Sequence, residues 1–206
     1  MILRAVTPRA PGTEDRAYTD RMLASEGAWW NRYLDAQAPW RWNLRRLRPG
    51  FTLDVGCGIG RNLRHLDGHG VGVDHNPHSV AAARRFGLTA LTPAEFERSE
   101  FNRPGRFDSL LLSHVAEHMP EEELRALLAS YLTSLRAGGR VIVITPQEAG
   151  YRSDATHVRF VDFAALDRIV RDAGLRPSRA YSFPFPRTAG RFFKYNEFVS
   201  VSEKPA

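Results

Sequence analysis

The sequence has 206 residues and one cysteine, Cys57, so it has no internal disulfide, which is typical of proteins in reducing compartments. This cysteine lies between two glycines, which favours a small buried residue over a catalytic thiol. No apolar run approaches the roughly 20 residues that span a bilayer, and the first residues lack the apolar core of a secretory signal. These absences predict a cytoplasmic protein that does not bind membranes.

Long runs of like charge are also absent, although the chain is basic. It has 29 lysines and arginines against 23 aspartates and glutamates, which gives a net charge of +6, and its pI is about 10.0. The cations are nearly all arginines and are scattered along the chain. The positive charge would suit an anionic partner such as RNA or an acidic saccharide, but it does not by itself predict nucleic-acid binding.

A regular alternation of apolar segments and helical patterns is present from residue 51 onward. The segments FTLDVG, GVGVD, LTAL, RFDSLLL and RVIVITP predict strands, and helical patterns follow most of them. This alternation predicts a parallel sheet with helices on both faces. The last two strands, LRPSRAYSF and YNEFVSVSE, have no helix between them, which predicts an antiparallel hairpin at the sheet edge. Before the sheet, we expect aromatic helices that stop at Pro39 and a short helix at 41–47.

The stretch LDVGCGIGRN, residues 53–62, predicts a glycine-rich turn between a strand and a helix. Asp74 follows Asp54 by twenty residues and ends the next strand, where a carboxylate can accept both hydroxyls of a ribose. A dinucleotide site would need G-x-G-x-x-G, but the sixth position counted from Gly56 is Arg61. The phosphate-binding pattern G-x-x-x-x-G-K is absent as well.

The pattern D-x-G-x-G-x-G, followed in order by VGVDHNP, FDSLLLSHVAEHM and LRAGGRVIVITP, resembles the class I S-adenosylmethionine-dependent methyltransferases over about residues 41–202. The resemblance implies an α/β fold with a Rossmann-like seven-stranded sheet in the order 3-2-1-4-5-7-6, strand 7 antiparallel, and helices on both faces. It implies a methyltransferase domain at 41–206, preceded by an arm and helical lid at 1–40. It also implies S-adenosylmethionine as the cofactor.

Roles at the cofactor follow from the same resemblance. The glycines would line the methionine part, Asp74 the ribose, and His75 and Asn76 the adenine, while Ser113 and His114 would face the sulfonium. Asp54 has two roles left open, namely orienting the cofactor ammonium or capping backbone N–H groups of the loop. The implied cofactor residues are Asp54, Gly56, Cys57, Gly58, Gly60, Asp74, His75, Asn76 and Ser113. Beside the adenine amine the candidates are Thr92, Ala94 and Glu95.

The segment LLLSHVAEHMPEEE, residues 110–123, places histidines and a carboxylate at the end of the fourth strand, the edge where open α/β sheets bind ligands. A helical turn over 113–118 would put His114, Glu117 and His118 on one face. His157, after the fifth strand, opens on the same edge. We expect these residues to act on an acceptor hydroxyl, either through a bound Mg²⁺ or Mn²⁺ or through a histidine base. A purely structural role is the third possibility.

This segment is similar to the E-x-x-E-H metal motif of small-RNA 2′-O-methyltransferases and ubiquinone-pathway O-methyltransferases. Glu117 and His118 match the terminal E-H, and His157 matches the later histidine of the RNA enzymes. His114 stands where the first glutamate would be, which favours Mn²⁺ or another softer ion over Mg²⁺.

Aromatic and polar residues of three regions are candidates for the acceptor pocket, although packing of helices on the sheet would also explain the aromatic ones. The predicted acceptor contacts are Trp29, Trp30, Tyr151, Arg152, Asp154, Arg187 and Tyr195, with Tyr33, Trp40, Trp42 and Asn196 as further members. We expect O-methylation of a sugar hydroxyl in a small or oligomeric acceptor of mannose type. The alternatives are a ribose 2′-O-methyltransferase acting on RNA, a phenolic or quinone-pathway enzyme, and a partner subunit without chemistry. The edge hairpin and the aromatic arm would both suit a homodimer.

Overall fold

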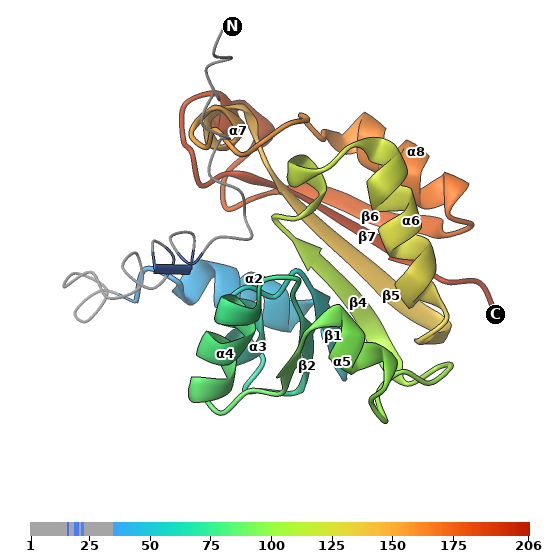
Figure 1. Cartoon of the computed structure of the whole chain (residues 1–206). Coiled ribbons are helices and arrows are strands. Elements are labelled where there is room, and N and C mark those ends of the chain that lie inside the picture. Colours follow the sequence, from blue (N-terminus) through green and yellow to red (C-terminus); the bar gives the residue numbers. More distant parts are fainter. Residues whose placement is uncertain (1–15, 17–18, 21, 23–34) are drawn as a thin grey trace, which may run out of the picture.

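The computed structural model describes residues 16, 19–20, 22 and 35–206, and its centre is one seven-stranded sheet (Figure 1). The strand order is β3-β2-β1-β4-β5-β7-β6, and β7 alone runs antiparallel to its neighbours. The strands are β1 (Thr52–Val55), β2 (Gly70–Val73), β3 (Ala90–Leu91), β4 (Phe107–Ser113), β5 (Leu135–Pro146), β6 (Arg176–Phe183) and β7 (Glu197–Glu203). The predicted topology is confirmed.

The helices follow the strands in the expected alternation. They are α2 (Ala38–Arg46), α3 (Arg61–His65), α4 (Pro77–Arg85), α5 (Pro93–Glu97), α6 (Glu121–Leu132), α7 (Glu148–Arg152) and α8 (Phe163–Asp172), with 3₁₀ turns η2 (Ala116–His118) and η3 (Arg187–Arg191). The sequence did not predict α5, α7 or η3. Within the described residues, no helix combines the length and apolar character needed to cross a membrane.

Pro39 lies inside the first turn of α2, whereas the sequence analysis placed a helix end there. Proline is tolerated in a first turn because the N–H it lacks would have no partner within the helix. The helix of this region therefore starts at Ala38, three residues earlier than expected. This places Trp40 and Trp42 on the helix that covers one face of the sheet.

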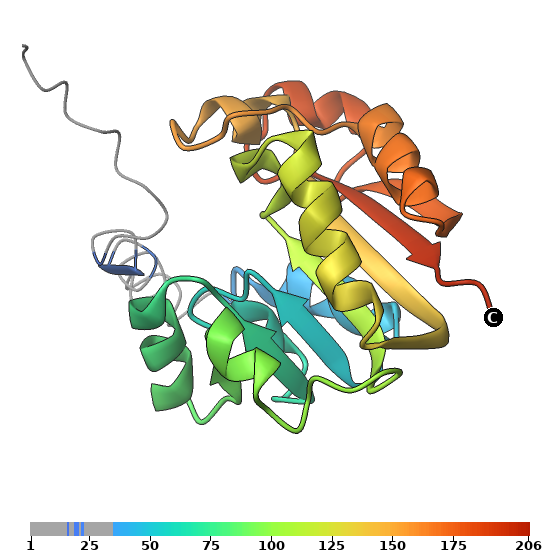
Figure 2. The same cartoon turned by 45° about the vertical axis from the view of Figure 1, so that its right-hand side comes forward.

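Alternating side chains of the central strands fill two apolar layers, as the two-residue period of a strand requires. Leu110, Leu112 and Val143 face the layer that includes α6 and α8. Leu111 and Ile142 face the opposite layer, which includes α2. Figure 2 shows α6 and α8 on the near side of the strands, with α2 behind them.

The carboxyl ends of β1, β2, β4 and β5 meet at one edge, because these strands run parallel. The antiparallel register brings Glu197, the first residue of β7, opposite Pro146 at the end of β5. The connection from β6 to β7 therefore reaches the same edge. Every predicted catalytic residue lies there.

A core substitution tests the packing of the first layer. Phe107 is fully buried, and its ring stacks on that of Phe51 with centroids 5.3 Å apart. We expect Phe107→Ala to lower the free energy of unfolding by about 3–5 kcal/mol, because it leaves a cavity. Urea denaturation measures this change. Phe86→Ala is the control, since that ring is 46% exposed, and an equal loss in both variants would contradict the packing described.

Candidate active site

The glycine loop adopts a backbone that other residues rarely accept. Gly56, Gly58 and Gly60 have φ values of 75°, 53° and 80°. A Cβ on Gly56 would lie 2.4 Å from a methyl carbon of Val115. The carbonyl of Val73 accepts hydrogen bonds from the backbone N–H groups of Gly56 (2.7 Å) and Cys57 (3.1 Å), so the loop is fastened to the end of β2.

Asp74 joins the loop to the residues after β2. Its Oδ2 accepts a hydrogen bond from the Gly58 N–H (2.7 Å) and its Oδ1 one from the Asn76 N–H (2.8 Å). The Asn76 side chain caps α4 by accepting from two backbone N–H groups, and the His75 side chain is 50% exposed. The structure therefore places the predicted ribose carboxylate directly beside the glycine loop.

Asp54 is fully buried at the end of β1. No backbone N–H of the described residues donates to its carboxylate oxygens, so Asp54 caps no loop N–H there, and the nearby Asn62 side chain partly stabilises the charged carboxylate. Burial raises the pKa of Asp54 to about 7, and the neighbouring Asp74 carboxylate adds to the rise. Of its two predicted roles, this arrangement favours an interaction with a cationic group of the ligand.

Cys57 packs in a small apolar cluster with Val80 and Ala83. Burial raises the pKa of its thiol well above the usual value, so the thiolate is disfavoured. The residue thus serves packing, as its position between glycines predicted. After β3, Thr92 caps α5 in a reciprocal capping box with Glu95.

The end of β4 differs from the expected helical turn. Ser113 is the last residue of β4, and His114 has a left-handed backbone with φ 57°. The 3₁₀ turn η2 begins only at Ala116. A left-handed residue cannot continue a right-handed turn, so His114 and His118 do not share a helix face.

The His114 ring lies between two carboxylates. Its Nδ1 is 3.2 Å from Oε1 of Glu117, and its Nε2 is 2.9 Å from Oε1 of Glu197. Partial desolvation of this side chain, which is 43% exposed, lowers its pKa, but the two carboxylates outweigh this effect and raise the pKa to about 10. An imidazolium has no free lone pair. Both ring nitrogens of His114 thus face carboxylates in this structure, and His114 is not among the three residues whose potential ligand atoms lie together.

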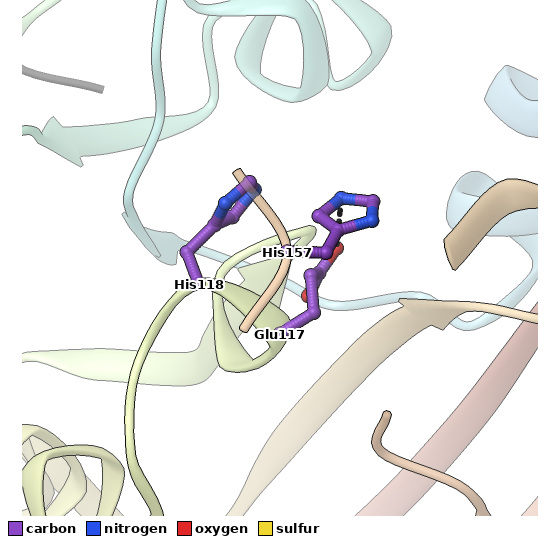
Figure 3. A group of neighbouring side chains, drawn as sticks. All are labelled: Glu117, His118 and His157. Carbon is purple, nitrogen blue, oxygen red and sulfur yellow. Dashed lines mark ion pairs between the residues drawn. The ribbon is translucent and has the colours of Figure 1, made fainter. Parts of the chain in front are cut away.

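Glu117, His118 and His157 form a compact group (Figure 3). One potential ligand atom from each lies within 4.8 Å of the others. Glu117 is fully buried, and its Oε1 is 3.9 Å from Nε2 of His157. Its Oε2 has no hydrogen-bond partner among residues 16, 19–20, 22 and 35–206. The structure thus brings together three of the four residues that the sequence analysis proposed for a metal.

Hydrogen bonds assign the ring protons of both histidines. Nδ1 of His157 lies 2.8 Å from the carbonyl of Tyr151, and a carbonyl only accepts, so this nitrogen carries a proton. Nδ1 of His118 lies 3.2 Å from the carbonyl of Thr156, which fixes the same tautomer. The Oγ1 of Thr156, also 3.2 Å from that Nδ1, donates its own proton to Asp154 and is left to accept.

In these tautomers Nε2 of each ring keeps its lone pair, the arrangement that metal-binding and proton-accepting histidines require. Burial lowers the pKa of His118, which keeps its ring neutral.

Backbone hydrogen bonds attach the loop after α7 to η2. The carbonyl of Glu117 accepts from the N–H groups of Val158 (2.9 Å) and Arg159 (3.2 Å). The Tyr151 ring stacks on that of His157, with centroids 5.6 Å apart. Tyr151 is thus a predicted acceptor residue that contacts the histidine group directly.

The other predicted acceptor residues have separate positions. Arg187 forms an ion pair with Glu148, and a guanidinium nitrogen of Arg152 donates to the carbonyl of Arg191. Tyr195 is 53% exposed. Asp154 accepts hydrogen bonds from the backbone N–H and the hydroxyl of Thr156. Asn196 is buried and forms hydrogen bonds with Phe185 and Gln147. Trp29, Trp30 and Tyr33 lie outside the described residues.

The strand order, the glycine loop after β1 and the carboxylate after β2 define a class I methyltransferase fold. The methyltransferase domain family matches residues 30–178. The chain therefore belongs to this family and is a methyltransferase that uses S-adenosylmethionine. A search of curated proteins finds no match.

Solved structures of low sequence identity share the fold. A SAM-dependent methyltransferase from Archaeoglobus fulgidus is 17% identical, with a TM-score of 0.67 over 89% of this chain and 99% of that one. A putative methyltransferase in complex with the Haloferax volcanii Trm112 activator is 18% identical, with a TM-score of 0.69 over 96% and 100%. Magnesium protoporphyrin IX methyltransferase from Synechocystis, with bound SAH, is 17% identical, with a TM-score of 0.64 over 93% and 96%.

The raised pKa of Asp54 predicts a pH dependence of cofactor binding. If its carboxylate binds the cofactor ammonium, the free protein must first release a proton below pH 7, which weakens binding there. We expect the Kd for S-adenosylmethionine to fall about tenfold from pH 6 to pH 8. Isothermal titration calorimetry measures it. In Asp54→Asn, binding should be weaker and lose this pH dependence; an unchanged dependence would assign it to another group.

Proposed function

We propose that this methyltransferase transfers the methyl group to a hydroxyl of a sugar or oligosaccharide, of mannose type as the sequence suggested. One observation carries the proposal. Two histidines with free Nε2 lone pairs and a buried carboxylate stand at the end of β4, the strand next to the glycine loop of β1. A sugar hydroxyl is a very weak acid, so its methylation needs a group that takes or polarises its proton.

The donor set fits a divalent ion. It offers two imidazole nitrogens and one carboxylate oxygen, and the Oε2 of Glu117 is buried with no partner in the described chain. Burying a carboxylate oxygen without a partner costs free energy, and a bound cation would recover that cost. Mixed nitrogen and oxygen ligands suit Mn²⁺ or another transition ion better than Mg²⁺. Such an ion, when bound, would polarise the acceptor hydroxyl and orient a neighbouring one.

The residues of the chain account for the remaining steps. Methyl transfer is an in-line displacement in which the acceptor oxygen attacks the methyl carbon and the carbon–sulfur bond breaks. The electron pair of that bond goes to sulfur, which loses its positive charge. Where no ion is bound, Nε2 of His118 or His157 accepts the hydroxyl proton, and the buried Glu117 carboxylate stabilises the resulting imidazolium. With an ion bound, these nitrogens would serve as ligands instead, and the polarised hydroxyl would lose its proton to water. His114 orients Glu117 through its hydrogen bond.

Ribose 2′-O-methylation of RNA is the second candidate, because it is also a reaction at a sugar hydroxyl and the chain carries a net charge of +6. Two similar structures have names that specify ring substrates. They are the protoporphyrin enzyme and the 1,6-didemethyltoxoflavin-N1-methyltransferase from Burkholderia thailandensis. A metabolite with an aromatic ring is therefore the third class to test. A homodimer remains a proposal from the sequence.

The direct test is methyl transfer from labelled S-adenosylmethionine to a panel of mannosides, other saccharides, RNA oligomers and phenols. Each acceptor is offered with EDTA, Mg²⁺ or Mn²⁺. We expect the label on a saccharide, loss of transfer in EDTA and recovery best with Mn²⁺. Transfer only to phenols or RNA would reject the saccharide, and transfer that ignores EDTA would leave the histidines as the sole proton acceptors.

Substitutions separate the chemistry from cofactor binding. We expect His118→Ala and His157→Ala each to lower kcat by about 10²–10⁴-fold, because each removes a proton acceptor or ligand from the hydroxyl. The Kd for S-adenosylmethionine should stay within about twofold, since neither residue lies in the glycine loop. His69→Ala, an exposed histidine before β2, is the control. Loss of cofactor binding in His118→Ala would show that η2 belongs to the cofactor site.

A further inference from the structure

Arginine and aromatic side chains alternate on the face of the sheet that α2 covers. On β6, Arg179, Tyr181 and Phe183 are two residues apart and so share one face. On α2, Trp42 and Arg46 are four apart and so share one side of the helix. We call these five residues the arginine–aromatic ladder.

The side chains of the ladder interleave in space. The Trp42 and Phe183 rings stack with centroids 6.4 Å apart. The Arg46 guanidinium lies 4.6 Å from the centroid of the Trp42 ring and 4.9 Å from that of Tyr181. The Arg179 guanidinium lies 4.8 Å from the Tyr181 centroid. Each guanidinium thus lies on a ring, which fixes its plane and leaves N–H groups at its edge for an anion.

Within the described residues, no carboxylate neutralises the charge of the ladder. Neither Arg46 nor Arg179 forms an ion pair in the part of the chain that the structure describes, and Nε of Arg46 donates a hydrogen bond to the neutral side chain of Asn43 (3.1 Å). Nearby carboxylates are engaged elsewhere, since Asp35 pairs with Arg41 and Asp67 with Arg45. At the first residue of β6, away from the ladder, Glu203 of β7 lies opposite Arg176 of β6 and Arg140 of β5 in the strand pairing. The ladder itself therefore presents uncompensated positive charge.

Aromatic contacts connect the ladder with the active-site edge. The Trp40 ring meets that of Phe183 edge-on at 6.2 Å and that of Tyr195 at 6.3 Å. The Lys194 ammonium lies 4.8 Å from the Tyr195 ring centroid. Tyr195 is two residues before Glu197, the partner of His114. A chain of ring contacts thus links Phe183 of β6 through Trp40 of α2 to Tyr195 near this edge.

We propose that the arginine–aromatic ladder binds an acidic oligosaccharide, one sugar of which reaches the methylation site; this rests on the proposed function. Carboxylates of uronate residues fit the fixed guanidinium edges, which bind carboxylates in two-point contacts. Sugar rings pack against the side chains of Trp42 and Tyr195, which are 57% and 53% exposed.

Single-stranded nucleic acid fits this surface less well. Its bases bind by stacking on open aromatic faces. The guanidinium groups of Arg46 and Arg179 both lie over the Tyr181 ring. The Trp42 ring is in contact with the guanidinium group of Arg46 and stacks with the ring of Phe183. The ladder thus offers donors at its surface more than open ring faces.

Three hexamers of matched length test the proposal by titration calorimetry at low salt. The probes are hexagalacturonate, neutral maltohexaose and hexauridylate. We expect hexagalacturonate to bind at least about tenfold more tightly than maltohexaose, with an affinity that falls as salt is added. Hexauridylate binding more tightly through the same arginines would overturn the saccharide assignment. Equal binding of the acidic and neutral hexasaccharides would overturn the role of charge.

A matched pair of double variants locates the binding. Arg46→Ala with Arg179→Ala should weaken hexagalacturonate binding by about tenfold or more. Arg85→Ala with Arg98→Ala removes the same charge from exposed positions near the other end of the sheet and should leave it within about twofold. Equal losses of hexagalacturonate affinity in both double variants would show that binding depends only on the net charge of the protein, and would overturn the proposal. Thermal unfolding confirms that each variant folds.

Activity separates failure of this inference from failure of the proposed function. Methylation of a neutral saccharide, with equal hexagalacturonate binding by wild type and Arg46/Arg179 variants, would overturn the ladder alone. Ladder-dependent hexagalacturonate binding, with no saccharide methylated, would overturn the proposed function and leave the ladder as a binding surface.

Discussion

The buried carboxylate of Glu117 is the constraint on which the acceptor edge depends. A carboxylate without water costs several kcal/mol unless charged or polar groups face it. His114 faces Oε1 and is itself held by Glu197 at the start of β7, while His157 approaches from the loop after α7. The backbone carbonyl of the same glutamate accepts the N–H of Val158. One residue thus fixes three segments that are remote in sequence, and the two histidines with free lone pairs are positioned as a result.

The cofactor edge is organised in a comparable way by Asp74. Its carboxylate accepts N–H groups from the glycine loop and from the residue that caps α4, so the loop after β1 and the helix after β2 are held together. β1 and β4 are adjacent strands, with Asp54 opposite Leu111. The two carboxylate-centred sites are therefore neighbours along one edge. This proximity is what a methyl donor and a hydroxyl acceptor need in order to react.

Local features of the sequence were sufficient for the sheet and the glycine loop. The strands are apolar runs, and Gly56 and Gly60 take positive φ values that are intrinsic to glycine. The backbone of His114 could not be predicted, because its left-handed conformation is supported by the carbonyl of Ile144 and the carboxylate of Glu197, 83 residues away. The short elements α7 and η3 are likewise joined by an ion pair between residues far apart in sequence, Glu148 and Arg187. The glutamate and both histidines were correctly grouped, but their proton positions required the carbonyls of Tyr151 and Thr156.

The arginines of the chain are distributed unequally between paired and unpaired environments. On the α6 and α8 side, the one carboxylate of Glu121 forms ion pairs with three arginines, Arg125, Arg159 and Arg168. Arg168 and Arg125 lower the pKa of Glu121 to about 2. In the described part of the chain the ladder has no such carboxylate, and Arg46 and Arg179 flank the Tyr181 ring as like charges. Ring contacts offset part of this repulsion, but they do not neutralise the charge. The net charge of +6 is therefore not a uniform property of the surface. A bound anion would remove the remaining repulsion at the surface that leads to the acceptor edge, and it would do so without competing with an ion pair of the protein itself.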